Sequence, residues 1–167
     1  MGNANVQSDS ITITDSDWES GWIYFQPSPN TTVSRRALVD TLDVPALTDE
    51  IESSGLVQVY FKTREGAQSD AWSALPWSKL SFSGEFTYNL EYTYDTGTIT
   101  LYYYYERNSS GVTAPDVTNA TLPDYRFKWV VASEDAASSM SSAGISIEDH
   151  DAVAQFLDQR LNGEPVR

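Results

Sequence analysis

Six aromatic side chains are the residues of this sequence best suited to contact a ligand directly. An aromatic ring that reaches solvent can stack on a sugar ring or on the side chains of a partner protein. The candidate stacking residues are Trp18, Trp22, Trp72, Trp77, Tyr102 and Tyr104. If these rings lie on one open face, they indicate a carbohydrate-binding module; if they are buried, they indicate a scaffold or a protein-interaction domain.

The run Tyr102–Tyr105 shows why the sequence leaves this choice open. Side chains on a strand alternate between two faces, so Tyr103 and Tyr105 continue a core stripe while Tyr102 and Tyr104 point the other way. On an open face this second pair would form a stacking platform. On a second buried face, or lying along neighbouring polar residues, the same pair would be structural.

A short acidic segment offers weak metal ligands. The sequence DSDWESG places Asp15, Asp17 and Glu19 at alternate positions, which superficially resembles a calcium loop. The glycine falls one place late for the helix–loop–helix spacing, and no bidentate glutamate follows at the right position. We therefore expect a solvated turn here, and we predict neither a metal site nor a cofactor.

No combination of residues predicts a catalytic centre. His150 is the single histidine, the chain has no cysteine, and neither G-x-S-x-G nor H-E-x-x-H occurs. A catalytic histidine needs a nucleophile and an orienting acid beside it, which no motif here supplies. We predict a protein that is not an enzyme. The alternative is a small hydrolase using a pair among its 24 Asp and Glu residues.

The charge balance excludes several partner classes. The 167 residues carry a net charge of −14, with only ten Lys and Arg. This charge repels nucleic acids and anionic lipid surfaces, so we expect neither as a partner. The acids are scattered, which indicates a folded surface of an extracellular or a salt-adapted protein. The sequence contains no run of about 18 apolar residues, the length that a membrane-spanning helix requires.

The residues 85–106 (EFTYNLEYTYDTGTITLYYYYE) give the clearest structural prediction. Apolar and polar residues alternate on both sides of Asp95-Thr96-Gly97, which predicts two half-buried antiparallel strands. Gly97 supplies the positive φ that a three-residue hairpin loop with a bulge usually needs. One face of this hairpin must pack on a core.

Further strands and two helices complete the predicted fold. Strands are expected at Ser10–Thr14, Trp22–Gln26, Arg36–Val44, Leu56–Lys62 and Tyr125–Val131, and a turn at Gly66–Asp70. A short helix should follow Thr48, and a C-terminal helix should span Ser146–Leu161, with Ser146 and Asp149 as a capping pair and an apolar stripe that docks on a sheet.

These elements predict a mainly β fold: an antiparallel β-sandwich of immunoglobulin-like type with a C-terminal α-helix, or otherwise a flattened barrel. The expected division is a flexible lead at 1–9, the sandwich at 10–132, a connector at 133–145 and the helix at 146–162. The predicted core residues are Val57, Val59, Phe61, Phe86, Tyr88, Leu90, Leu101, Tyr103, Phe127 and Trp129.

The order of these motifs resembles a group of uncharacterised secreted or lipid-anchored β-sandwich proteins of Bacteroidetes-type bacteria. The resemblance rests on ITIT, the DW turn, DVPALT, GLVQVYFKT, W-x-x-LPW, YxxDTGTITLYYYY, YRFKWVVA and IEDHDAVAQFLDQ, and covers Ile11–Leu161. It implies export and an unassigned activity, with lipid anchoring possible in a full-length precursor. This chain departs from the group in having no lipid-bearing cysteine and in its proline-containing insertion at Gln26–Arg35.

Together these observations predict a non-enzymatic exported or cell-surface module of unassigned specific function. Its partner would be a protein or a glycan at the cell surface or in the periplasm. We expect a secreted location with the export signal removed, and a cytoplasmic location is the alternative.

Overall fold

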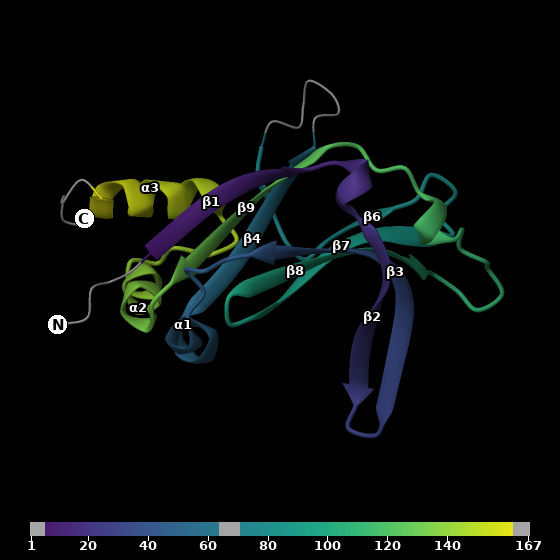
Figure 1. Cartoon of the computed structure of the whole chain (residues 1–167), viewed down its shortest axis with the longest axis horizontal. Helices are drawn as coiled ribbons and strands as arrows, with labels where there is room; N and C mark the ends of the chain where they lie inside the picture. The colour runs from purple at the N-terminus through teal and green to yellow at the C-terminus, as the bar shows by residue number, and fades with distance from the viewer. Residues whose placement is uncertain (1–5, 64–70, 162–167) are drawn as a thin grey trace.

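The alternating segments pair into two antiparallel sheets that face each other. In the computed structural model, which describes residues 6–63 and 71–161, four strands form sheet A and five form sheet B. Sheet A has the order β1 (Val6–Ile13), β9 (Tyr125–Ala132), β4 (Leu56–Thr63) and β5 (Ser73–Ala74). Sheet B has the order β2 (Glu19–Ser28), β3 (Thr31–Asp43), β8 (Thr98–Arg107), β7 (Phe86–Asp95) and β6 (Trp77–Leu80). The predicted antiparallel β-sandwich is confirmed (Figure 1).

The predicted central hairpin is β7 and β8. The pairs run from Phe86 opposite Arg107 to Asp95 opposite Thr98, so the connecting turn is Thr96-Gly97. This two-residue turn corrects the expected three-residue loop with a bulge. Gly97 has φ +80°, and its N–H and C=O bond to Leu47 and Val44 in the segment after β3. The turn is therefore fixed by tertiary backbone bonds as well as by its own geometry.

The core between the sheets contains most of the predicted residues. Those that are buried there are Val57, Val59, Phe61, Leu90, Leu101, Tyr103 and Phe127. Tyr88 and Trp129 are partly buried against this core. Phe86 is also half-buried, because it begins β7 and packs on the rings of Tyr88 and Tyr105 at the margin of the sheet. The hydroxyl of Tyr92 donates to the Val57 carbonyl at 2.9 Å and links the two sheets.

Two helices, α2 (Glu134–Ser142) and α3 (His150–Leu161), form a second core with the outer face of sheet A. The buried residues of this second core are Tyr60, Val130, Ala132, Ala136, Met140, Val153 and Phe156. The docking of the C-terminal helix on the sheet is therefore confirmed. Figure 1 shows α3 lying beside β1 and β9 of sheet A.

Three segment boundaries in the structure differ from those predicted. The expected connector at 133–145 contains α2, because Ser133 caps it and Ala136 and Met140 form a buried stripe four residues apart. α3 begins at His150 rather than at Ser146, because the Asp149 carboxylate accepts the Ala152 N–H at 3.1 Å and so caps the helix. The expected lead at 1–9 overlaps β1, whose strand pairing with β9 begins at Val6.

The β2–β3 hairpin is longer than predicted and projects from the body of the molecule (Figure 1). Its strands pair from Glu19–Val39 to Ser28–Thr31, with a bulge between Phe25 and Ser28 that accommodates Pro27. Gly21 lies against Val39, where a Cβ would approach the valine Cγ2 to 2.6 Å. A side chain at this position would displace the side chain of Val39.

The remaining short elements connect the sheets. The predicted helix after Thr48 is α1 (Asp49–Ser54), and the Thr48 hydroxyl accepts the Ile51 N–H. Two 3-10 turns, η1 (Asp15–Asp17) and η2 (Val117–Asn119), lie in the loops before β2 and before β9. The expected turn at Gly66–Asp70 lies outside the described residues. No helix of the described chain is long and apolar enough to cross a membrane.

Candidate functional site

Two of the six candidate stacking residues belong to the core between the sheets. Trp18 is only 8% exposed and meets the ring of Phe127 edge-on at 6.2 Å. Its indole N–H has no hydrogen-bond partner among the described residues. Trp77 is half-buried and packs edge-on against Phe61 at 5.0 Å. Neither ring is placed to receive a sugar, and both stabilise the sandwich.

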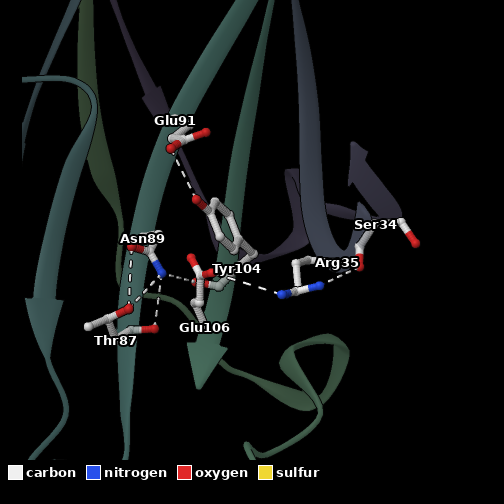
Figure 2. A network of polar contacts seen from close by, with 7 residues as sticks. All are labelled: Ser34, Arg35, Thr87, Asn89, Glu91, Tyr104 and Glu106. Atoms are coloured by element: carbon white, nitrogen blue, oxygen red, sulfur yellow. Dashed lines mark hydrogen bonds and ion pairs between the residues drawn. The ribbon is translucent and has the colours of Figure 1, made fainter. Parts of the chain in front are cut away.

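Tyr104 is buried on the outer face of sheet B. It is 3% exposed and covers Ile23 and Ala37, with the ring of Phe25 at 5.5 Å. Its hydroxyl donates to Glu91 Oε1 at 3.0 Å, as Figure 2 shows. Burial, and then the Glu91 carboxylate, raises the pKa of this tyrosine. The ring is thus structural, which is the second of the two alternatives that the sequence left open.

Neighbouring polar groups on this face bond mainly to each other (Figure 2). The Asn89 amide donates to the Thr87 carbonyl and hydroxyl, both at 3.1 Å, and to the Tyr104 carbonyl at 3.4 Å. The hydroxyl of Tyr102, which is half-buried, lies 3.2 Å from the Thr93 hydroxyl. These contacts satisfy buried polar atoms, and no stacking platform forms from Tyr102 and Tyr104.

Trp72 lies on the outer side of sheet A, beside the first turn of α3. Its half-buried ring contacts Lys62 on β4 and Arg126 on β9, and His150 of α3 packs on it with ring centroids 5.4 Å apart. The ring therefore fills the space between the sheet and the first turn of the helix.

Trp22 is the one candidate that combines high exposure with an organised neighbour. Its side chain is 46% exposed, and Arg36, its cross-strand partner on β3, places its guanidinium carbon 4.8 Å from the ring centroid. Tyr24, two residues along β2 and therefore on the same face, is 67% exposed. Two exposed aromatic residues are thus held side by side on the projecting hairpin.

Two adjoining cavities lie beside this part of the hairpin. One, of about 220 Å³, is lined by Arg36, Tyr105, Ala114, Pro115, Asp116 and Val117. The other, of about 300 Å³, is lined by Arg35, Tyr105, Arg107, Thr113 and Ala114. Tyr105 and Ala114 line both cavities, so the cavities adjoin; Arg36 lines the first, and Arg35 and Arg107 line the second. We call Trp22, Tyr24, Arg35, Arg36, Tyr105 and Arg107 the hairpin surface.

Local hydrogen bonds hold the charged groups of this region in place. Asp116 accepts the N–H and the hydroxyl of Thr118 at 3.0 and 2.7 Å, and these bonds lower its pKa, with a smaller contribution from Arg36. Arg107 donates to the Val112 carbonyl at 3.3 Å. Arg35 makes a long, exposed ion pair with Glu106 at 3.9 Å, which holds it weakly. The arginines therefore keep donors available to a ligand, since each guanidinium has five.

The sequence singled out Trp22 but missed Tyr24, Arg36 and the cavities. The alternation of Trp22 and Tyr24 was a usable signal, because two aromatic residues at i and i+2 of a strand share a face. The cavities could not be found in this way, because the loop that leads to η2 folds back against Tyr105 only in the tertiary structure.

Two of the three weak metal candidates accept hydrogen bonds from the protein itself. Asp15 accepts the Leu122 N–H at 2.7 Å, and Asp17 accepts the Thr14 N–H and hydroxyl at 2.8 and 2.9 Å. Glu19 is exposed at the start of β2. Within residues 6–63 and 71–161 no group of three His, Asp or Glu residues could hold a metal ion.

Asp40 is the carboxylate that comes nearest to the acid-pair chemistry of a hydrolase. Burial, and then the charges of Asp17 and Glu19, raises its pKa. The Asp17 carboxylate is, however, engaged by Thr14, and neither cavity of the hairpin surface is lined by Asp40. The geometry assigns no general acid and nucleophile to this group.

Comparisons with protein-family models, with curated proteins and with solved structures find no match to this chain.

Proposed function

We propose that this protein is a non-enzymatic module, exported or displayed at the cell surface, that binds a partner protein through the hairpin surface. The observation that carries the proposal is the exposed Trp22 with Arg36 stacked on it, beside a concave region lined by two further arginines. The extracellular location rests on the resemblance of the sequence to secreted β-sandwich proteins.

The residue types of the hairpin surface favour a protein partner. Trp, Tyr and Arg dominate the binding energy of protein interfaces, where they occupy well-packed central positions. Trp22, Tyr24 and Arg36 are held by paired strands, and stacking restrains the Arg36 guanidinium before binding. Such preorganisation reduces the conformational entropy that a complex must overcome.

The charges predict the chemistry of the partner. Three guanidinium groups around Tyr105 suit carboxylates, which arginine binds through two parallel hydrogen bonds. The aromatic rings beside them suit an apolar side chain. The partner would therefore present Asp or Glu next to an aliphatic or aromatic residue.

A carbohydrate ligand fits the arrangement less well. The six candidate stacking residues are distributed over the core, the hairpin and the outer faces of both sheets, so they do not form one flat array. Of the six, Trp22 alone is strongly exposed, with Tyr24 beside it on the same face, and Arg36 already covers part of the Trp22 ring.

Selection from a displayed peptide library tests the proposal. Peptides selected on the wild-type protein should contain acidic residues next to apolar ones, and their dissociation constants are measured by fluorescence titration. Trp22→Ala or Arg36→Ala should weaken binding at least about 30-fold, the loss expected of an interface hot spot. The matched control is Phe82→Ala, which removes a fully exposed aromatic residue outside the hairpin surface.

Two results would contradict the proposal. Peptides that bind wild-type and Trp22→Ala equally would show that the hairpin surface is not the recognition site. A polysaccharide from a glycan array whose binding Trp22→Ala abolishes, with no selected peptide, would assign the surface to a glycan instead.

A further inference from the structure

Cationic residues gather at a second place in this strongly acidic protein. Only three of the 167 residues are lysines, and two of them, Lys62 and Lys128, lie on the outer face of sheet A with Arg126. The single histidine, His150, approaches the same place from the first turn of α3. Lys62, Arg126, Lys128 and His150, arranged around Trp72, are here called the cation cluster.

Three of these groups contact one indole ring. The Lys62 Nζ lies 4.8 Å from the Trp72 ring centroid, and the Arg126 guanidinium carbon lies 5.8 Å from it. The His150 imidazole packs against the same ring with an interplanar angle of 32°. Cation–π attraction holds each charge near the indole, and it also brings like charges together.

The contacts of His150 define its protonation. Its Nε2 lies 3.0 Å from the Lys128 Nζ, and its Nδ1 lies 3.1 Å from Asp151 Oδ1. An ammonium group can only donate, so Nε2 accepts from Lys128 and Nδ1–H donates to Asp151. The imidazole is therefore neutral in this arrangement, and Lys128 carries the charge.

Two cations of the cluster have no carboxylate partner among the described residues. Arg126 and Lys128 form no ion pair there, since the recorded pairs join Arg35 to Glu106 and His150 to Asp151. Asp149 caps α3 through the Ala152 N–H, and the Asp151 side chain is 99% exposed while it accepts from His150. Burial disfavours the charged form of Lys128 and lowers its pKa.

A purely structural role accounts for only part of the cluster. Packing of α3 on sheet A requires the apolar residues of the second core, such as Tyr60, Val153 and Phe156, and needs no positive charge. The side chains of the cluster are all half-buried, so each keeps part of its surface accessible to solvent. Arg126 and Lys128 remain accessible and have no carboxylate partner within residues 6–63 and 71–161, and two such cations on one face suit an incoming anion.

We propose that the cation cluster binds an oxyanion group, namely a carboxylate, sulfate or phosphate. Lys128 and Arg126 would donate charge-assisted hydrogen bonds to its oxygen atoms, which are stronger than neutral ones. The Trp72 ring would pack against the carbon skeleton that carries the group. This site is independent of the hairpin surface, which lies on the other sheet.

The single histidine makes the test specific to this site, because its ring protons give one set of NMR signals. Sodium phosphate, sodium sulfate and sodium glucuronate are titrated separately at pH 7.5, with sodium chloride of equal ionic strength as the control for screening. The His150 signals should shift and saturate with at least one oxyanion and should not follow chloride. Saturation by glucuronate alone would identify an acidic sugar as the source, and saturation by phosphate or sulfate an inorganic or ester group.

Charge-removing variants complete the test. Lys128→Met and Arg126→Gln should each raise the dissociation constant of the oxyanion at least tenfold. Lys79→Met, which removes the exposed third lysine on β6, should leave oxyanion binding unchanged. Thermal unfolding checks that each variant is folded. If Lys128→Met is unfolded, the binding test is made with Arg126→Gln alone. The proposal is overturned if chloride causes the same shifts, if no oxyanion saturates the signal below about 50 mM, or if folded Arg126→Gln binds as the wild type does.

Discussion

Trp22 and Trp72 are both tryptophans with a cationic side chain 4.8 Å from the ring, yet their surroundings differ completely. Trp22 lies on β2, an edge strand that pairs only with β3, and its cation is supplied by the neighbouring strand. Trp72 lies between sheet A and α3, and the cations around it come from two strands and a helix. A tryptophan with a stacked cation is thus exposed on a projecting hairpin in one region and lies beneath a helix in the other.

The difference shows that the tertiary packing around a tryptophan with a stacked cation, and not the pair itself, decides whether the ring is exposed. Where α3 covers the sheet, its packing fixes the positions of His150 and Trp72 together. Where no helix covers the hairpin, Trp22 and Tyr24 remain open to a partner. Variants that loosen one region should therefore leave the other intact.

The largest effect is expected from Phe156→Ala in α3. Phe156 is 1% exposed in the second core, and removing such a ring leaves a cavity that costs about 3–5 kcal/mol of unfolding free energy. Urea denaturation measures this loss, and Gln155→Ala, at an exposed position of the same helix, is the control. In the folded variant the His150 NMR signals should change while peptide binding at the hairpin surface persists.

A loss of stability below about 1 kcal/mol for Phe156→Ala would mean that α3 is not held by its apolar stripe. Equal damage to peptide binding at the hairpin surface would contradict the independence of the two regions.

A smaller effect is expected from alkaline pH. Burial raises the pKa of Tyr92 to about 12, whereas an unfolded tyrosine ionises near pH 10. Because the folded pKa is the higher one, the stabilisation is fully present below pH 10 and is lost as the pH rises through about 12. Burial raises the pKa of Tyr60 in the same direction, and its hydroxyl donates to the Ile147 carbonyl just before α3.

Denaturation curves at pH 8, 10 and 11 measure how much unfolding free energy is lost at alkaline pH. In Tyr92→Phe this loss should be smaller. A stability that does not change between pH 8 and 11 would show that these phenols are not buried in the folded protein. The helix-covered side should respond first in hydrogen exchange, since Tyr60 lies in the second core.

The smallest effect is expected from Tyr104→Phe on the hairpin side. The variant keeps the ring over Ile23 and Ala37 and removes only the hydrogen bond to the Glu91 carboxylate; bonds to charged groups contribute about 1.5–3 kcal/mol. Chemical denaturation measures the change. Tyr102→Phe is the matched control and should change stability less, because its hydroxyl bonds to an exposed threonine. A larger loss for the control would contradict the assignment of Tyr104 as the buried member of the pair.

Much of the fold could be predicted because the local pattern and the tertiary environment agree. The alternation in β7 and β8 and the apolar stripe of α3 each specify a face that must be buried, and both faces are buried as expected. α2 was missed because its sequence, EDAASSMSS, is weakly apolar and becomes a helix through a serine cap and a two-residue buried stripe. The start of β1 was missed because the polar residues 7–10 gain their strand structure from pairing with β9.

The candidate site was predictable only in part. Trp22 could be selected from its size and its neighbours in the sequence, but Trp18 and Trp77 could be selected on the same grounds, and these two rings lie in the core. Which rings are exposed depends on which strand reaches the edge of a sheet. A single sequence does not specify that order.

The sequence by itself determined the strand faces, the positions of the main turns and the excess of negative charge, because these depend on side-chain alternation and composition. Only the tertiary structure decided that Arg36 meets Trp22 and that Lys62, Arg126, Lys128 and His150 meet around Trp72. These residues are brought together by strand order and by the docking of α3. Both arise from long-range packing, whose free energy depends on the whole chain and not on any local segment.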